Sequence, residues 1–314
     1  MAHSYQDRFS KIVAAKLNAS LVTKDNVIFN TYYEGDPKAG AVKIPVRDGN
    51  PTVASYSKTA VGNNALTYGS TAYITATLDN DKFVNEYIDG YEAAAVPDGL
   101  VADRLNAAGY ALAAAEDADG IATLINAVQG KNRAGNSYPS TDPRYQKAGT
   151  VTPVSTADGF SKTTAYSFAV GLAKALDEKN VPQEGRFLIV DPTARALLLQ
   201  DDNFIRYGDL SQQLKESGAI GQIAGMAVYL SNRMGKGADI TIGTTAYYGY
   251  VTMLAGHPDY CTRVDEWLIN PKLVSLEQDA NVVGGSAVKG RWVFTHEVTS
   301  PEAFAMVTRP VSKT

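Results

Sequence analysis

The sequence has little cysteine, little histidine and no long apolar run. There is one cysteine, Cys261, and there are three histidines in 314 residues. A single cysteine cannot form a disulfide within the chain, and a thiolate zinc site needs several. No stretch approaches about 18 consecutive apolar residues, so no transmembrane helix is expected. Residues 1–8 also lack the apolar core of a signal peptide. We therefore predict a protein made in the cytoplasm, with no membrane partner.

Charge of either sign is also sparse. The net charge is −4 and charged residues make up 20% of the chain. This balance fits neither a basic nucleic-acid binder nor an acidic tail. The same charge balance is compatible with a protein that encloses nucleic acid without binding it tightly. The length and the 45% hydrophobic content suit one large domain or two coupled ones.

Catalytic motifs are missing or incomplete. Residues 35–40 begin like a phosphate-binding P-loop, but Ala41 and Val42 stand where lysine and Ser/Thr are needed. His257 and Cys261 are four residues apart, yet Pro258 interrupts any helix between them, and two ligands do not complete a zinc site. We therefore predict no enzyme activity, no cofactor and no metal.

Three glycines, Gly218, Gly221 and Gly225, superficially resemble a dinucleotide-binding loop. Their spacing is wrong for that loop, and the segment leads into an apolar strand instead of a helix. Glycine at such positions supplies a positive φ or lets two backbones approach closely. We predict that the three glycines form a structural turn.

The first 80 residues contain an arm followed by two alternating segments. In the arm, residues 4–24, apolar side chains recur at near-helical spacing at Tyr5, Phe9, Ile12, Val13 and Leu17. The arm can dock on its own domain or on a neighbouring subunit, and the sequence leaves both open. Residues 41–47 and 72–78 alternate with period two and predict a long hairpin. Pro45 cannot donate a ladder hydrogen bond, which places its strand at an edge.

A long helix is predicted over residues 100–129, with Asp98 as N-cap. Its apolar stripe changes face near residues 117–120, which predicts a kink or burial on different sides at the two ends. An irregular loop should follow over 130–158, and then a helix capped by Asp158 that stops near Asn180. Further strands are expected at residues 186–190, 225–230, 238–242, 291–298 and 303–308.

Three stretches carry a resemblance to a known family. Residues 185–198 predict a short apolar strand and a helix that begins at Asp191-Pro192. Residues 218–228 follow the pattern G-x-I-G-x-I-x-G-x-x-V into a second strand, and residues 287–298, AVKGRWVFTHEV, predict a closing one. In this order, after an arm, a hairpin and a long helix, the chain resembles the major capsid proteins of tailed bacteriophages with the Hong Kong 97-type fold.

The resemblance implies an α+β fold with four parts. They are an N-terminal arm (1–30), an extended hairpin called the E-loop (31–78), a peripheral domain with a long spine helix (79–150 and 286–314), and a compact axial domain (151–285). It also implies that copies form hexamers and pentamers, which close an icosahedral head around double-stranded DNA that they contact without sequence preference. Intersubunit contacts are expected at Tyr5, Phe9, Lys43, Arg47 and Lys58.

The resemblance further implies partners and a location. About 30 residues precede the hairpin, too few for the scaffolding segment of some relatives, so a separate scaffolding protein is expected. A portal is a second expected partner, and a decoration protein is an optional one. Assembly would take place in the cytoplasm of a bacterial host and end in the virion. Two alternatives stay open: an encapsulin shell that packages a cargo enzyme, and an α+β enzyme whose β-arm serves oligomerisation.

Overall fold

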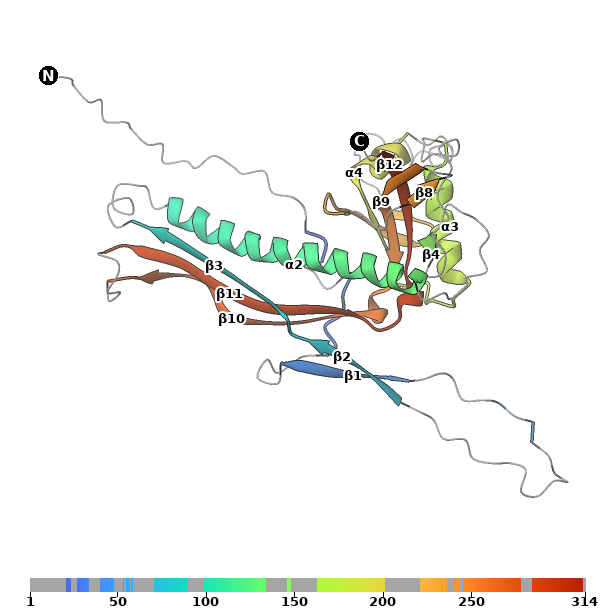
Figure 1. Ribbon diagram of the computed structural model, residues 1–314, viewed down its shortest axis with the longest axis horizontal. Coiled ribbons are helices and arrows are strands. Elements are labelled where there is room, and N and C mark those ends of the chain that lie inside the picture. Colours follow the sequence, from blue (N-terminus) through green and yellow to red (C-terminus); the bar gives the residue numbers. More distant parts are fainter. Residues whose placement is uncertain are drawn as a thin grey trace.

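The computed structural model is organised around one long helix, α2 (Gly99–Arg133), which joins an elongated sheet to a compact one (Figure 1). The structure describes residues 21–23, 27–33, 40–47, 53, 55–56, 58, 71–89, 99–133, 146–147, 163–200, 221–235, 240–242, 245–277 and 284–312.

The elongated sheet is antiparallel, in the order β10 (Cys261–Ser275), β11 (Ser286–Val298), β3 (Asn80–Ile88). Helix α2 lies along one face of it (Figure 1). Val288 packs near Ala108, and Trp292 and Phe294 pack near Leu112. These apolar contacts fix the N-terminal half of the helix on the sheet.

The compact sheet has seven strands and holds the largest core. Its central strand β5 (Phe187–Val190) is buried at every residue, which is typical of a strand covered on both faces. Asp191 caps helix α4 (Pro192–Leu198) by accepting a hydrogen bond from the Ala194 amide, as predicted. The other elements are β4 (Gln146–Lys147), α3 (Ala165–Asp177), β6 (Gln222–Ile223), β7 (Met226–Leu230), β8 (Ile240–Ile242), β9 (Thr245–Gly256) and β12 (Ala305–Ser312).

The two ends of α2 are buried in different cores. Ala108 and Leu112 face the elongated sheet, whereas Ile121, Leu124 and Val128 belong to the compact core. The helix is continuous through residues 117–120. Of the two predicted outcomes, burial on different sides is therefore the correct one. The predicted cap Asp98 lies outside the described residues.

The predicted hairpin strands are confirmed. β1 (Ala41–Arg47) pairs antiparallel with β2 (Thr71–Thr77), from Ala41 opposite Thr77 to Arg47 opposite Thr71. They form a separate two-stranded sheet, so Pro45 does sit on an edge strand. In Figure 1 one end of the pair lies beside β11, and the other end projects away from both larger sheets.

Some predictions were wrong or incomplete. Helix α3 has Thr164, not Asp158, at its N-cap, and Asp158 lies outside the described residues. Strands β3, β9 and β10 were not anticipated. The four-part division of the chain remains a proposal, but three strands pair across its boundaries: β10 joins the elongated sheet, and β4 and β12 join the compact one. Pairing between distant strands, which local composition does not encode, decides where each belongs.

A tight turn joins β6 to β7. Ile223 pairs with Met226, and the two residues between them have positive φ, +49° at Ala224 and +79° at Gly225. Two such residues define a type I′ turn, whose twist matches the flanking strands. Gly221 has neither a positive φ nor a close neighbour, since a Cβ there meets nothing within 4 Å. Gly218 lies outside the described residues. The conformational need for glycine is therefore at Gly225, not at Gly221.

This difference is testable by a matched pair of substitutions. Gly225→Val should lower the free energy of unfolding by about 1–2 kcal/mol, because a β-branched residue is strained in the left-handed region. Gly221→Val should change it by less than about 0.5 kcal/mol. Urea denaturation of both variants beside the natural protein measures this, and equal effects at the two positions would contradict it.

Candidate functional site

Acidic residues in the middle of α2 form the centre of a buried ionic cluster. Glu116 and Asp117 each have 0% of their surface exposed. A buried carboxylate is unfavourable unless charged or hydrogen-bonding partners surround it. The partners come from the N-terminal segment 21–30, from β10 and β11, and from the loop after β7.

Asp117 anchors the N-terminal segment. One carboxylate oxygen accepts hydrogen bonds from the backbone amides of Val22 (2.8 Å) and Thr23 (3.0 Å) and from the Thr23 hydroxyl (3.0 Å). The other oxygen faces the Arg233 Nε at 3.3 Å, as an ion pair without hydrogen-bond geometry. Arg233 also donates to the carbonyl of Ala114. One side chain thus ties the N-terminal segment and the loop after β7 to the long helix.

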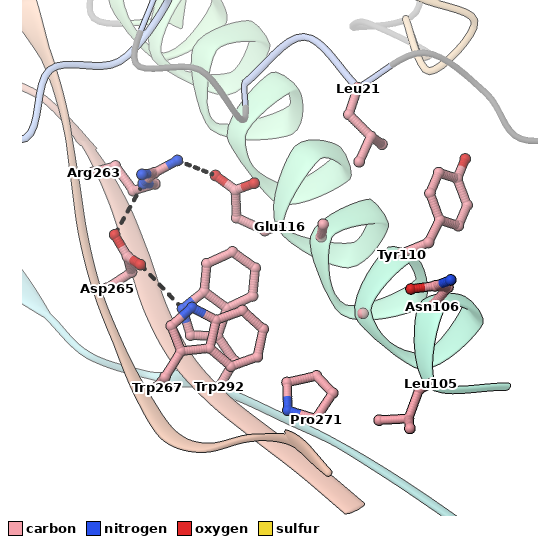
Figure 2. Close-up of a pocket in the computed structure, with 12 residues that line it drawn as sticks. Leu21, Leu105, Asn106, Tyr110, Glu116, Arg263, Asp265, Trp267, Pro271 and Trp292 are labelled. Carbon is pink, nitrogen blue, oxygen red and sulfur yellow. Dashed lines mark hydrogen bonds and ion pairs between the residues drawn. The ribbon is translucent and has the colours of Figure 1, made fainter. Parts of the chain in front are cut away.

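Glu116 extends the cluster towards the elongated sheet. It accepts a hydrogen bond from the Thr23 hydroxyl at 3.1 Å and lies 3.4 Å from the Arg263 guanidinium. Arg263 pairs in turn with Asp265 at 3.0 Å, and Asp265 accepts from the Trp292 indole at 3.1 Å. Figure 2 shows this chain of contacts along one side of a groove. Each buried charge therefore has an opposite charge or a donor beside it.

His296 on β11 lies between two carboxylates of α2. Its Nε2 is 3.1 Å from Glu116, and its Nδ1 is 2.9 Å from Asp119. Burial alone lowers the pKa of His296, but the hydrogen bonds and charges of Asp119 and Glu116 outweigh it, and the net pKa is raised. In the protonated form both ring nitrogens donate, one to each carboxylate. Asp119 also accepts from Asn80 at 3.2 Å, the first residue of β3 after the hairpin.

The N-terminal segment fits against α2 because residue 120 is glycine. A Cβ at Gly120 would lie 3.0 Å from the Phe29 ring, 3.1 Å from Thr23 and 3.2 Å from His296. The segment then pairs with β10: the Asn30 amide donates to the Cys261 carbonyl at 3.0 Å, and the Arg263 amide donates to the Asn30 carbonyl at 2.8 Å. Backbone bonds and the ionic cluster therefore hold this segment together.

A groove of about 650 Å³ opens beside the cluster, between α2 and β10 (Figure 2). Trp267 and Trp292 stack at 4.4 Å between ring centroids, and both line it. Leu21 lies at its edge. The remaining lining residues are Leu105, Asn106, Gly109, Tyr110, Ala113, Glu116, Arg263, Asp265 and Pro271.

The predicted intersubunit residues lie away from this cluster. Lys43 on β1 and Lys58 beyond it are exposed, while Arg47 is the last residue of β1. Tyr5 and Phe9 lie outside the described residues. Their role in intersubunit contacts stays a prediction. Sequence reasoning did not single out exposed apolar residues in and beside the hairpin, Tyr73 (64% exposed), Tyr56 (76%) and Val53 (96%). Side chains of β2 alternate between two faces, so Tyr73 lies on the face opposite Ile74 and Ala76. This alternation could have identified Tyr73 as an exposed apolar residue.

His257 and Cys261 have structural partners. His257 accepts a hydrogen bond from the Asp259 amide at 3.2 Å, and its other ring nitrogen lies 2.7 Å from the Glu184 carbonyl oxygen. The Cys261 thiol donates to the Ile28 carbonyl at 2.9 Å, and burial raises its pKa well above the ordinary value. Within the described ranges, no three His, Cys, Asp or Glu side chains are grouped as metal ligands, and no helix is long and apolar enough to cross a membrane.

Comparison with known proteins identifies the family. A family model described as "Phage capsid protein" matches residues 91–307, more than half of the chain. The chain therefore belongs to the phage capsid protein family. No curated protein matches the sequence.

Solved structures show the same fold at low sequence identity. A structure titled "Mycobacterium phage Che8" is 19% identical, with a TM-score of 0.66 over 96% of this chain and 95% of that one. The capsid of cyanophage P-SCSP1u is 15% identical, with a TM-score of 0.67 over 99% and 94%. The mature capsid of bacteriophage PhiM1 is 13% identical, with a TM-score of 0.65 over 99% and 93%. The predicted α+β phage-capsid fold is thus confirmed at this level.

The anchoring role of Asp117 predicts a large effect of removing its side chain. Asp117→Ala leaves Arg233 without its counterion and two backbone amides without their acceptor, and should lower the free energy of unfolding by about 3–5 kcal/mol. Asp117→Asn keeps one acceptor oxygen and should cost less. Urea denaturation of both variants measures the difference. A loss below about 0.5 kcal/mol in Asp117→Ala would contradict the anchor.

The position of His296 predicts a pH dependence with a definite sign. Because the folded protein raises the pKa of His296, the protonated ring contributes stability that is complete below the unfolded value, about 6.5. That contribution is lost as the pH rises through the folded-state pKa. The stability difference between the natural protein and His296→Gln should therefore shrink as the pH rises above about 6.5 and through the raised folded-state pKa of His296. Denaturation curves across that range test this, and a difference that grows with pH would contradict it.

Proposed function

We propose that this chain is a Hong Kong 97-type major capsid protein whose copies form hexamers and pentamers and close an icosahedral head around double-stranded DNA. The observation that carries this is the β1–β2 hairpin. Among the described residues its strands pair only with each other, and it carries Tyr73 exposed to solvent. A two-stranded sheet is marginal alone in water. A neighbouring subunit is the natural surface for it to rest on.

A four-part subunit fits this proposal once β10 is assigned to the peripheral domain and β4 and β12 to the axial domain. The hairpin corresponds to the E-loop, α2 to the spine helix, the elongated sheet to the peripheral domain, and the compact sheet to the axial domain. One patch of each subunit then meets a different patch of the next, and such heterologous contacts close into rings. Intersubunit contacts are proposed at Tyr5, Phe9, Lys43, Arg47 and Lys58. Exposed ion pairs contribute only about 0–1 kcal/mol each, so contact area repeated over many subunits would hold the shell.

The protein's role in this proposal is mechanical, not catalytic. A net charge of −4 suits a wall that touches DNA without gripping it. A separate scaffolding protein, a portal and an optional decoration protein are its proposed partners, with assembly in the bacterial cytoplasm. The family match favours a phage head over the encapsulin alternative.

Excision of the hairpin tests the proposal. The Leu78 amide donates to the Gly40 carbonyl at 3.1 Å, so the two ends of the hairpin meet and a short Gly-Ser linker can replace residues 41–77. The excised subunit should keep its circular dichroism spectrum and a cooperative melt, because both cores lie elsewhere. Co-expressed with the scaffolding protein, the natural chain should give closed shells by electron microscopy, and the excised chain should give none.

A matched control separates the surface of the hairpin from its presence. Tyr73→Asp keeps the hairpin and alters one exposed side chain, so the subunit should melt as the natural protein does but yield fewer shells. Closed shells from the excised chain would refute the role given to the hairpin. A natural chain that stays monomeric by light scattering beside its scaffold would refute the capsid proposal itself.

A further inference from the structure

The groove between α2 and β10 has apolar walls that nothing described covers. Its charged residues Glu116, Arg263 and Asp265 are engaged with one another and with Trp292 (Figure 2), and Tyr110 accepts a hydrogen bond from Arg233. What remains for an occupant is mainly the surface of Trp267, Leu105, Pro271 and Leu21, with Asn106 beside them, because Trp292 is only 5% exposed. The groove therefore suits an apolar side-chain stripe and not a charged ligand.

The floor of the groove is formed by small residues of α2. Gly109 and Ala113 are one turn apart and both line it, and a Cβ added at Gly109 would meet nothing within 4 Å. Glycine inside a helix lowers helix stability relative to alanine, and no contact among the described residues requires it here. A glycine also lets another backbone approach closely. The open space above Gly109 thus leaves room for another backbone to approach α2.

The chain that leads into the groove has a matching stripe. Leu21 lies at its edge, and the residues before it place an apolar side chain at every fourth position, at Leu17, Val13, Phe9 and Tyr5. Residues four apart share one face of a helix. The described chain therefore enters the groove at the last residue of this stripe, while Asp117 holds Val22 and Thr23 in place beside it.

The lengths also agree. From Glu116 to Leu105 the groove follows 11 residues of α2, or about 16 Å. A helix of the same length that ends at Leu21 begins near residue 10, so Val13 and Leu17 fall within the groove. Phe9 and Tyr5 fall beyond its end, which leaves them available for the neighbouring subunit, as proposed above.

We propose that residues 10–20 dock as a helix in this groove of their own subunit, with Val13 and Leu17 against Gly109, Ala113 and the stacked tryptophans. The docked helix would cover the spine before any shell forms and direct the first nine residues towards the next subunit. This proposal concerns the unassembled subunit, so it can be tested, and can fail, independently of whether shells form.

Disulfide trapping in dilute, unassembled full-length protein tests the contact. Leu17→Cys combined with Gly109→Cys should form an intrachain disulfide at least tenfold faster than Ala15→Cys combined with Gly109→Cys, since residue 15 lies on the opposite face of the stripe. The natural Cys261 is buried and gives little background. Equal rates for the two pairs would overturn the proposal. Disulfide-linked dimers as the main product would also overturn it, because the occupant would then be a second copy's segment.

Tryptophan fluorescence gives an independent readout without new cysteines. The chain has two tryptophans, and both line this groove. Because Trp292 is only 5% exposed, the change should come from Trp267: Leu17→Asp should increase acrylamide quenching of its emission at least twofold and shift it to longer wavelength, whereas Ala15→Asp should leave both unchanged. Identical quenching in Leu17→Asp and the natural protein would overturn the proposal.

Discussion

The buried pairing of carboxylates on α2 with cations and amides from four other segments is the interaction on which the structure depends. Glu116 and Asp117 are fully buried, so each is tolerable only while its partners are in place. Those partners are Thr23, Arg233, Arg263 and His296. A displacement of any segment leaves a buried charge uncompensated, which makes the N-terminal segment, the helix and both sheets depend on one another.

Elements with a local pattern were predictable from the sequence. The alternation of residues 41–47 gave β1, and the Asp191-Pro192 pair gave the start of α4. The long alanine-rich run predicted α2, including the change of buried face near residue 120. Each of these depends on residues within a few positions of one another, which is the range over which periodicity and capping act.

The ionic cluster could not be predicted in this way. Thr23 is 94 residues from Asp117, and Glu116 is 180 residues from His296, so no local spacing relates them. β10 was missed for a different reason: bulges interrupt its register between Trp267 and Lys272, and Pro271 lies within it, which obscures the alternation. The sequence predicted the two strands of the hairpin. It did not show that, among the described residues, no third strand pairs with them, and this is what makes the exposed Tyr73 a candidate contact residue.

The burial of α2 in two cores has a mechanical consequence. A packed side-chain core resists continuous deformation. Since one uninterrupted helix is embedded in both, the elongated and compact parts of the subunit cannot swing about a flexible linker. In the proposed shell, a subunit that fits positions of different curvature would therefore have to bend the helix itself, or change the twist of the elongated sheet beneath it. The bending stiffness of α2 would then limit the range of shell curvature to which one subunit can adapt.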